Sequence, residues 1–345
     1  MVTGMRNTTQ LKIVNVERVR RAIKENPDST KAMIASVTGL SIATCNSILN
    51  EMLDDEEILI SEKNMNSGGR PANLFSYNRN YQHGLGLYVS NEDNNHRLSY
   101  AVCDALGTII EEETEAHDVI DASTIDEKIS TLLHRFSKIR GIGIGVPGEV
   151  QDGTIHMCDI EALRGVDLME QLKAKYSCSF VIENDMDFIT LGYYQDLLSK
   201  QQIDKNDNLA VIYFSKEHLP GCGVVIGGNL LKGNTMFAGE ISYISKAYGI
   251  PRKAQVELMN SPETVADYAA KAIISVIALL DPKIIVLFGE VIKGVNRESI
   301  ENKCLEIIPE KNMSSLVVGE NIHAHYMKGL IDITINSMGV ELQLL

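Results

Sequence analysis

Hydrophobic residues near the start of the chain recur every three or four positions, which is the spacing of an amphipathic helix. Val16, Val19 and Ile23 share one face of this first predicted helix. Pro27 ends it, because the residue before a proline avoids the helical backbone region. Ser29 is then expected to cap a short second helix, TKAMIASV.

A third predicted helix, IATCNSILNEMLDDEEI, follows the turn TGLS. Gly39 suits the turn because glycine adopts a left-handed backbone readily, and Ser41 is placed to cap the helix. An apolar stripe marks the buried face: Cys45, Ile48, Leu49 and Met52. Small side chains off that stripe can approach base edges and phosphates closely, so they are predicted to contact DNA. They are Ser41, Ala43, Thr44, Asn46, Ser47 and Asn50.

Three helices followed by two short strands form the pattern of a winged helix-turn-helix. The strands are expected within ILISEKNMNSGGRPANLFSYN, on either side of a glycine-rich tip. Arg70 lies on that tip, where an arginine can enter the narrow and strongly negative minor groove. The acidic run at 54–57 then has to face away from the phosphates. A small helical domain that binds protein is the alternative.

From about Tyr81 onward, predicted strands such as HGLGLYVS, NLAVIYFS and KIIVLFG alternate with predicted helices. This alternation is typical of an α/β architecture. The stretch GIGIGVPG, residues 141–148, predicts a strand that ends in a tight glycine loop, where a backbone can approach a ligand closely.

Composition and charge narrow the classes of function. The chain has 345 residues, 44% of them hydrophobic and 23% charged, as in globular proteins of more than one domain. The densest apolar run, AIISVIALL, is too short to span a bilayer, so a cytoplasmic protein with no membrane partner is expected. Residues 1–80 hold 10 basic and 9 acidic residues, and the remainder holds 22 and 37. Because an acidic body repels DNA, DNA contact is assigned to the N-terminal part.

Neither cysteines nor histidines predict a metal site. The 6 cysteines are scattered, which argues against a disulfide framework and a cysteine-rich zinc site. Among the 8 histidines, His323 and His325 are closely spaced, and we interpret them as a surface or strand feature.

Polar residues follow the apolar strand in the stretch SFVIENDMD. Glu183, Asn184 and Asp185 stand where the strand ends, and a helical pattern begins near Met186. Asp185 has three possible roles. It could act as a general base if a phosphoryl donor lies nearby, as a ligand-binding carboxylate, or as a helix cap without further function.

Four stretches, in this order along the chain, resemble the ROK family of repressors, open reading frames and kinases. They are the helix-turn-helix with GGRP, GIGIGVPGEVQDGTI, VIENDMD and GCGVVIGGNLLKGNTMFAGEISYI. The layout is similar to that of the regulator branch, which includes xylose and N-acetylglucosamine repressors. The resemblance implies a winged helix-turn-helix over 1–79 and a two-lobed, actin-like (ribonuclease-H-like) sugar-kinase fold over 80–345. The implied lobes are about 80–185 with the C-terminal helix, and about 186–320.

The resemblance also implies a sugar site. The family's asparagine–aspartate pair matches Asn184 and Asp185; in the kinases the aspartate is the base and the asparagine holds neighbouring hydroxyls. The Gly-Glu-Ile-Gly-His element matches residues 239–243, so Glu240 would accept hydrogen bonds from the sugar. Tyr243 stands in place of the histidine and keeps only a phenol for hydrogen bonding. Gly148 completes the implied sugar-binding set.

Departures from the family kinases concern the nucleotide. Tyr88 and Ser90 lie where an Asp-x-Gly-x-Thr phosphate loop is expected, and phosphate binding needs glycines so that several amides converge. Val225 and Phe288 replace glycines of two further nucleotide elements. The family's zinc-binding residues are absent from SKAYGIPRKAQVELMNSPE. We therefore expect no ATP, no cofactor, no metal and no catalytic role, with Asp185 only the equivalent of the kinase base.

The sequence thus predicts a DNA-binding regulator, a repressor of sugar uptake or catabolism genes. Its predicted partners are a double-stranded operator and a sugar or sugar phosphate that prefers one conformation. A homodimer or higher oligomer is expected, because paired half-sites supply specificity. Two alternatives stay open: an ATP-dependent ROK sugar kinase with a DNA-binding domain, and a regulator controlled by a protein partner without sugar binding.

Overall fold

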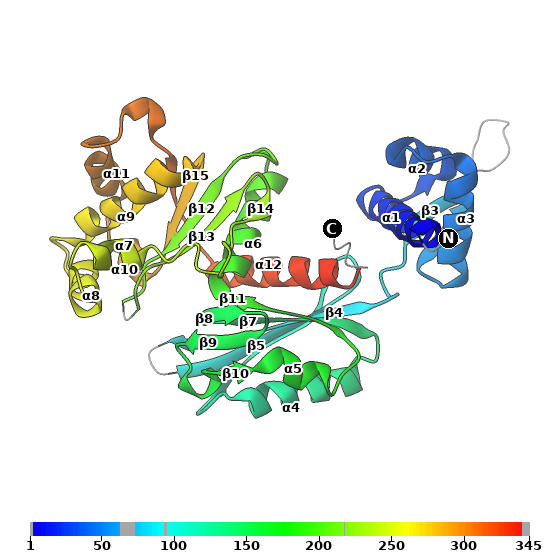
Figure 1. Cartoon of the computed structure of the whole chain (residues 1–345), viewed down its shortest axis with the longest axis horizontal. Helices are drawn as coiled ribbons and strands as arrows, with labels where there is room; N and C mark the ends of the chain where they lie inside the picture. Colours follow the sequence, from blue (N-terminus) through cyan, green and yellow to red (C-terminus); the bar gives the residue numbers. More distant parts are fainter. Residues whose placement is uncertain (1–2, 63–72, 93–94, 217, 340–345) are drawn as a thin grey trace.

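The N-terminal part of the chain folds as three helices and a small sheet (Figure 1). The computed structural model describes residues 3–62, 73–92, 95–216 and 218–339. The helices are α1 (Thr3–Glu25), α2 (Lys31–Thr38) and α3 (Ile42–Asp54), and the strands are β1 (Ser29–Thr30), β2 (Ile58–Glu62) and β3 (Asn73–Tyr77). The sheet order β1-β3-β2 places the two wing strands side by side, as predicted. Arg70 lies outside the described residues.

Two helix caps were predicted in this part, and one of them is wrong. Ser29 is buried in β1, and its hydroxyl donates to the carbonyl of Asn26 at 2.7 Å. Thr30 caps α2 instead, because its side chain accepts from the amide of Met33. Ser41 caps α3 as expected.

A buried ion pair joins α1 to the wing sheet. Glu57 is 4% exposed and pairs with Arg20, while the hydroxyl of Tyr77 donates to the same carboxylate at 3.0 Å. Glu17 binds Arg20 from the other side. The acidic run at 54–57 is therefore not uniform, since its last member is part of the core and does not face solvent.

The first large sheet has the order β11-β7-β4-β5-β6. Its strands are β4 (His83–Glu92), β5 (Asn95–Cys103), β6 (Ile109–His117), β7 (Ile139–Val146) and β11 (Ser179–Asn184). β4, β5 and β6 form an antiparallel meander, and β7 and β11 run parallel to β4.

The second large sheet repeats this arrangement with the order β14-β13-β12-β15-β16. Its strands are β12 (Leu209–Tyr213), β13 (Gly221–Ile226), β14 (Asn229–Leu230), β15 (Ile284–Phe288) and β16 (Ser315–Val318). Here too the first three strands are antiparallel and the last two are parallel to the first. Two copies of one topology confirm the predicted α/β fold class. The division at residues 79 and 80 stays a prediction.

Helices cover both faces of each sheet. In Figure 1, α12 (Ile322–Ser337) and α6 (Asp185–Ser199) lie between the two sheets, with α4 (Ala122–Arg135) and α5 (Leu168–Lys173) below the first. On β12, Leu209 and Val211 pack in the central core with α6 and α12, whereas Ala210 and Ile212 face the outer cluster with α9 (Val265–Leu280). The remaining elements are β8 (Gly148–Gln151), β9 (Thr154–Cys158), β10 (Val166–Asp167), η1 (Glu161–Leu163), α7 (Ser242–Ala247), α8 (Arg252–Asn260), α10 (Glu290–Lys293), α11 (Arg297–Leu305) and η2 (Glu310–Asn312).

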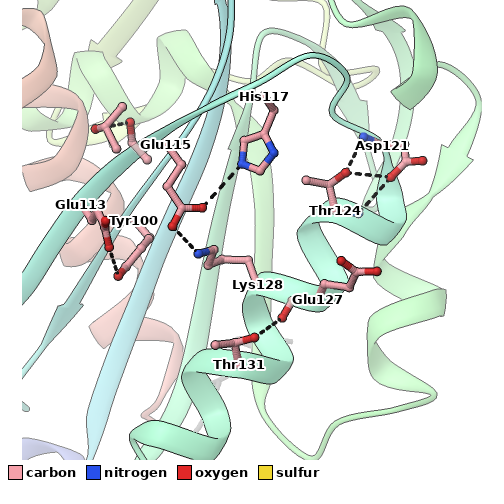
Figure 2. A network of polar contacts seen from close by, with 11 residues as sticks. Tyr100, Glu113, Glu115, His117, Asp121, Thr124, Glu127, Lys128 and Thr131 are labelled. Atoms are coloured by element: carbon pink, nitrogen blue, oxygen red, sulfur yellow. Dashed lines mark hydrogen bonds and ion pairs between the residues drawn. The ribbon is translucent and has the colours of Figure 1, made fainter.

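Figure 2 shows how polar contacts fix α4 to the outer strands of the first sheet. Asp121 and Thr124 form a capping box at the start of the helix. One turn later Lys128 pairs with Glu115 of β6 at 2.5 Å. The hydroxyl of Tyr100 on β5 donates to Glu113 and Glu111 of β6. The ammonium group of Lys128 thus neutralises part of the charge of the acidic strand β6.

The glycines of GIGIGVPG allow close packing of neighbouring elements. A Cβ at Gly143 would lie 2.1 Å from Oγ1 of Thr334 on α12, and one at Gly148 would lie 2.0 Å from the carbonyl oxygen of Met157. The strand glycines therefore let α12 lie directly on β7, and Gly148 lets β8 approach β9. Close approach of a ligand to the backbone at Gly148 stays a prediction.

Across the described ranges, no single helix is long and apolar enough to cross a membrane. The pair α2 and α3 meets the length and composition requirement together, but the two helices meet at 114°.

Candidate functional site

The candidate DNA interface is the solvent-facing side of α3. Ala43, Ser47 and Asn50 are exposed and recur at the spacing of one helix face, and Ser41 is exposed at the cap. The amide end of the helix adds a partial positive charge there. This row offers small side chains that can enter a major groove.

Two predicted DNA contacts are already engaged within the protein. The hydroxyl of Thr44 lies 2.9 Å from the Oγ of Ser41, and both are part of the cap. Lys31 of α2 donates to the amide oxygen of Asn46, which is half-buried. This contact orients Asn46 and brings a cation to the same surface, which the sequence pattern did not reveal.

A second candidate site lies where β11 ends. The Nδ2 of Asn184 donates to the carbonyl of Gly148 at 2.7 Å, and its Oδ1 accepts from the amide of Met186 at 2.7 Å. Asn184, and not Asp185, is thus the N-cap of α6. Asp185 is the first residue of the helix, so its role as the cap is wrong, although its carboxylate also accepts from Met186. We call Gly148, Asn184 and Asp185 the strand-end cluster.

The carboxyl group of Asp185 is unusual for an aspartate. Burial raises its pKa to about 7, and the negative charges of Asp159 and Asp187 add to the rise. The amide of Met186 and the nearby His218 oppose it. A carboxyl group poised to change charge near neutral pH is a frequent mark of a functional site.

Sequence reasoning missed two residues beside the strand-end cluster. Asp159 follows β9, and its Oδ2 lies 3.1 Å from the Nδ1 of His218, which follows β12 in the second half of the chain. The pair therefore links segments of the two repeats next to Asp185. No local pattern marks either residue, because each stands alone in an irregular loop.

A further ion pair crosses between the repeats nearby. Lys232, after β14, binds Glu183 of β11. Burial raises the pKa of Asp187 to about 6, while Lys232 opposes the rise.

Glu240 interacts with Glu149 beside the strand-end cluster, whereas Tyr243 packs against Phe237. Gly239, with φ of 98°, has a backbone that would put a Cβ 2.0 Å from the carbonyl of Cys222, so it sets the position of Glu240. Glu240 is exposed overall, but partial burial and the charge of Glu149, the neighbour of Gly148, raise its pKa. The ring of Tyr243 turns to Phe237, 4.9 Å away.

The three expected sugar residues Gly148, Asn184 and Asp185 are therefore in one cluster. Glu240 lies near this cluster, because its charge interacts with that of Glu149, the neighbour of Gly148. For Tyr243, the contacts described among the residues of the structure lead to Phe237 and Lys246 and not to the strand-end cluster.

The place expected for a phosphate loop is filled by aromatic rings. Tyr88 is 7% exposed and stacks on Tyr326 of α12 with ring centroids 4.0 Å apart. Its hydroxyl bonds the Nδ1 of His323, whose Nε2 lies 2.7 Å from Glu112. The histidine pair 323 and 325 is thus in the first turn of α12 and not in a strand, and the side chain of His323, 42% exposed, lies at the surface as one of the two predicted alternatives.

The other two altered nucleotide positions are also packed. Val225 is fully buried, and Phe288, 3% exposed, stacks on Tyr213 at 5.0 Å. In the part of the chain that the structure describes, no group of three or more His, Cys, Asp or Glu side chains is arranged to hold a metal ion.

Comparison with known proteins gives a consistent picture. The family model described as "ROK family" matches residues 95–255. The xylose repressor of Bacillus subtilis (strain 168) is 24% identical over 253 residues, which are 71% of this chain and 63% of the repressor. A glucokinase of Halalkalibacterium halodurans is 29% identical over 126 residues, 36% of each chain. The chain thus spans less than two thirds of the length of these relatives.

Solved structures extend the similarity in fold. A ROK family transcriptional regulator, a homologue of the E. coli MLC protein, superposes with a TM-score of 0.71 at 17% identity and covers 95% of this chain and 98% of that one. A ROK hexokinase from Thermus thermophilus gives a TM-score of 0.55 at 15% identity over 72% and 97% of the two chains. The matched residues 95–255 include β11 and the strand-end cluster, and the repeated sheets follow the same fold over the rest. The chain is thus similar to the ROK family over residues 95–255 and shares the fold of the solved ROK structures.

Proposed function

We propose that this protein is a cytoplasmic, dimeric DNA-binding regulator that represses genes for sugar uptake or catabolism. A sugar or sugar phosphate binds at Asn184, Asp185 and Glu240 and changes the affinity for the operator. The names of the related xylose repressors support the class of regulator and make D-xylose the first effector to test.

The exposed row on α3 is the observation that carries the proposal. Ala43, Ser47 and Asn50 form an exposed row of small side chains on one face of α3. They lie on the second helix of a helix-turn-helix, which is the helix that enters the major groove. The acidic remainder of the chain cannot take this role.

Fluorescence anisotropy with labelled DNA from the region upstream of the protein's own gene tests DNA binding. Ala43→Glu and Ser47→Glu each add a negative charge to the row, and we expect binding at least about tenfold weaker because phosphates repel the new charge. Thr131→Glu adds the same charge on exposed α4 and should bind as the wild type does. Equal binding by all variants would remove α3 from the interface.

Calorimetry tests the sugar site. We expect D-xylose, D-glucose, N-acetylglucosamine or one of their phosphates to bind the wild type, and Asp185→Asn or Glu240→Gln to lose binding. If none of them binds, a protein partner becomes the effector and the sugar proposal fails.

The kinase alternative is tested by incubation with ATP and the same sugars. The packing of Tyr88 against Tyr326 supports a non-enzymatic reading, since a phosphate needs converging backbone amides at that place. ATP-dependent formation of a sugar phosphate would overturn this part of the proposal.

A further inference from the structure

Tyr326 carries a hydroxyl group that the fold leaves without a partner. The residue is 6% exposed and its ring lies between Tyr88, at 4.0 Å, and Phe188, at 6.1 Å. Among the described residues its hydroxyl makes no hydrogen bond. A buried polar group without a partner is costly, so such groups call for an explanation in function.

The hydroxyl is aimed at the strand-end cluster. A Cβ at Gly145 would lie 2.2 Å from the Oη of Tyr326, so the phenol occupies the space that this glycine leaves free. Gly145 is paired in register with Glu183 of β11, and the next pair contains Asn184. Asp185 follows directly, and its charge acts on the phenol. The hydroxyl thus lies beneath the point where the proposed ligand binds.

The helix that carries Tyr326 follows a regular track along β7. Side chains one helical repeat of four residues apart face glycines two residues apart on the strand. The facing pairs are Tyr326 with Gly145, Leu330 and Thr334 with Gly143, and Met338 with Gly141. Four helical residues advance about 6 Å and two strand residues about 6.6 Å, so the two periods nearly match. The helix α12 therefore packs along the length of β7 with a regular register.

The far end of this helix touches the N-terminal part of the chain. A Cβ at Gly339, just after α12, would lie 3.5 Å from the Oε2 of Glu17 on α1. Glu17 binds Arg20, which pairs with Glu57 in the core beside the wing. In Figure 1, α12 runs between the two sheets toward the unit that contains α3.

We propose that Tyr326 is a ligand-contacting residue, whose hydroxyl donates to an oxygen of the bound sugar beside Asp185, and that α12 carries this contact to the DNA-binding unit. The inference rests on the proposed sugar-responsive function. A sugar supplies the acceptor that the phenol lacks in the structure. Because α12 packs turn by turn against the glycines of β7, a displacement of its first turn shifts the whole helix along β7. The C-terminal end of α12 then displaces Glu17.

The test compares Tyr326→Phe with the wild type by calorimetry, using D-xylose, D-glucose, N-acetylglucosamine and their phosphates as probes. Removal of a buried, unpartnered hydroxyl should raise the free energy of unfolding and leave sugar-free DNA binding unchanged. The affinity for the probe that binds the wild type should fall about tenfold, the worth of one hydrogen bond. Tyr193→Phe is the matched control, since its buried hydroxyl bonds the carbonyl of Glu320 and should not affect the sugar.

Equal sugar affinity in Tyr326→Phe and the wild type overturns the contact, while the proposed function stands. If no probe binds the wild type, sugar sensing itself fails, and the contact fails with it.

The coupling through α12 is tested separately with Gly143→Ala, which disturbs the packing of α12 on β7 and leaves Tyr326 unchanged. We expect this variant to bind the sugar but to lose most of the change in DNA affinity that the sugar produces in the wild type. A full sugar response in Gly143→Ala overturns the role of α12. Gly294→Ala, where a Cβ meets only one carbonyl at 3.9 Å, is the control for the substitution.

Discussion

Replacing Asp185 by asparagine should make the ligand-free protein more stable while it removes sugar binding. Asparagine keeps the shape of the side chain and an acceptor for the amide of Met186, which Asp185 bonds at 2.8 Å. It lacks the charge that is unfavourable in this half-buried position. The change therefore separates two roles of Asp185, since a residue that only supports the start of α6 would lose stability on substitution.

The magnitude follows from the pKa of Asp185, which burial raises from 3.8 to about 7. At pH 8 the folded protein bears the full cost of the charge, which corresponds to at most about 4 kcal/mol at about 1.4 kcal/mol for each tenfold change in proton affinity. Solvent screening of a partly exposed group reduces this to about 2 kcal/mol. The favourable interaction with the helix dipole, about 0.3–1 kcal/mol, is smaller.

The sign with pH is fixed by the same values. Between pH 3.8 and about 7 the folded protein holds a proton that the unfolded chain has released, so this group lowers the free energy of unfolding as pH rises through that window. Below pH 3.8 the carboxyl group is protonated in the folded and the unfolded state, so it no longer lowers the free energy of unfolding. The gain in the variant should thus be about 2 kcal/mol at pH 8 and close to zero near pH 4.

Urea unfolding at pH 4, 6 and 8, followed by circular dichroism, measures the gain in stability, with exposed Asp118→Asn as the control. Calorimetry with the sugar panel measures binding. A variant that is less stable than the wild type at pH 8 would refute the assignment of Asp185 as an unfavourably placed, functional carboxyl group. Sugar binding that survives the substitution would refute its contact with the ligand.

Three further changes test the fold around the sites. Glu57→Gln should lower the free energy of unfolding of the N-terminal part by about 3 kcal/mol, because it removes the buried charge that pairs with the partly buried Arg20; thermal melts followed by hydrogen exchange in α1 locate the loss. Gly143→Ala should cost about 1–3 kcal/mol through overpacking against α12, measured by urea unfolding beside Gly294→Ala. Lys232→Met should raise the pKa of Asp187 above about 6, since it removes the cation that opposes the rise, and a carboxyl NMR titration would record an unchanged value if the two groups do not interact.

Local patterns were enough to predict the elements of the N-terminal part. The spacing of Val16, Val19 and Ile23 predicted α1, and the turn before Ser41 predicted the start of α3, because these signals depend on neighbours in sequence. The cap of α2 was misplaced by one residue, from Thr30 to Ser29. Both residues can cap a helix, but Ser29 is buried and its hydroxyl donates to the carbonyl of Asn26, which leaves Thr30 as the cap.

Long-range packing accounts for most of what the sequence did not reveal. The glycines of β7 looked like a ligand loop, but they face side chains nearly two hundred residues later, such as Thr334. In the same way, Tyr88 could be recognised as a departure from the kinase pattern, whereas its partner Tyr326 could not be named without the fold. The link between Asp159 and His218 also depends on the two repeats meeting in space.

The ring of Tyr88 also constrains how such a chain can change over evolutionary time. Reversion to aspartate, the residue that the family kinases carry there, would remove a ring that packs on Tyr326 and leave a cavity in the central core. It would also add a carboxylate to a region where burial already disfavours the charged form of Asp185. A single reversion therefore passes through a destabilised intermediate with no gain in phosphate binding. Under the proposed regulatory function, the packed ring of Tyr88 therefore opposes the gain of a phosphate site by single substitutions, while the strand-end cluster can still vary.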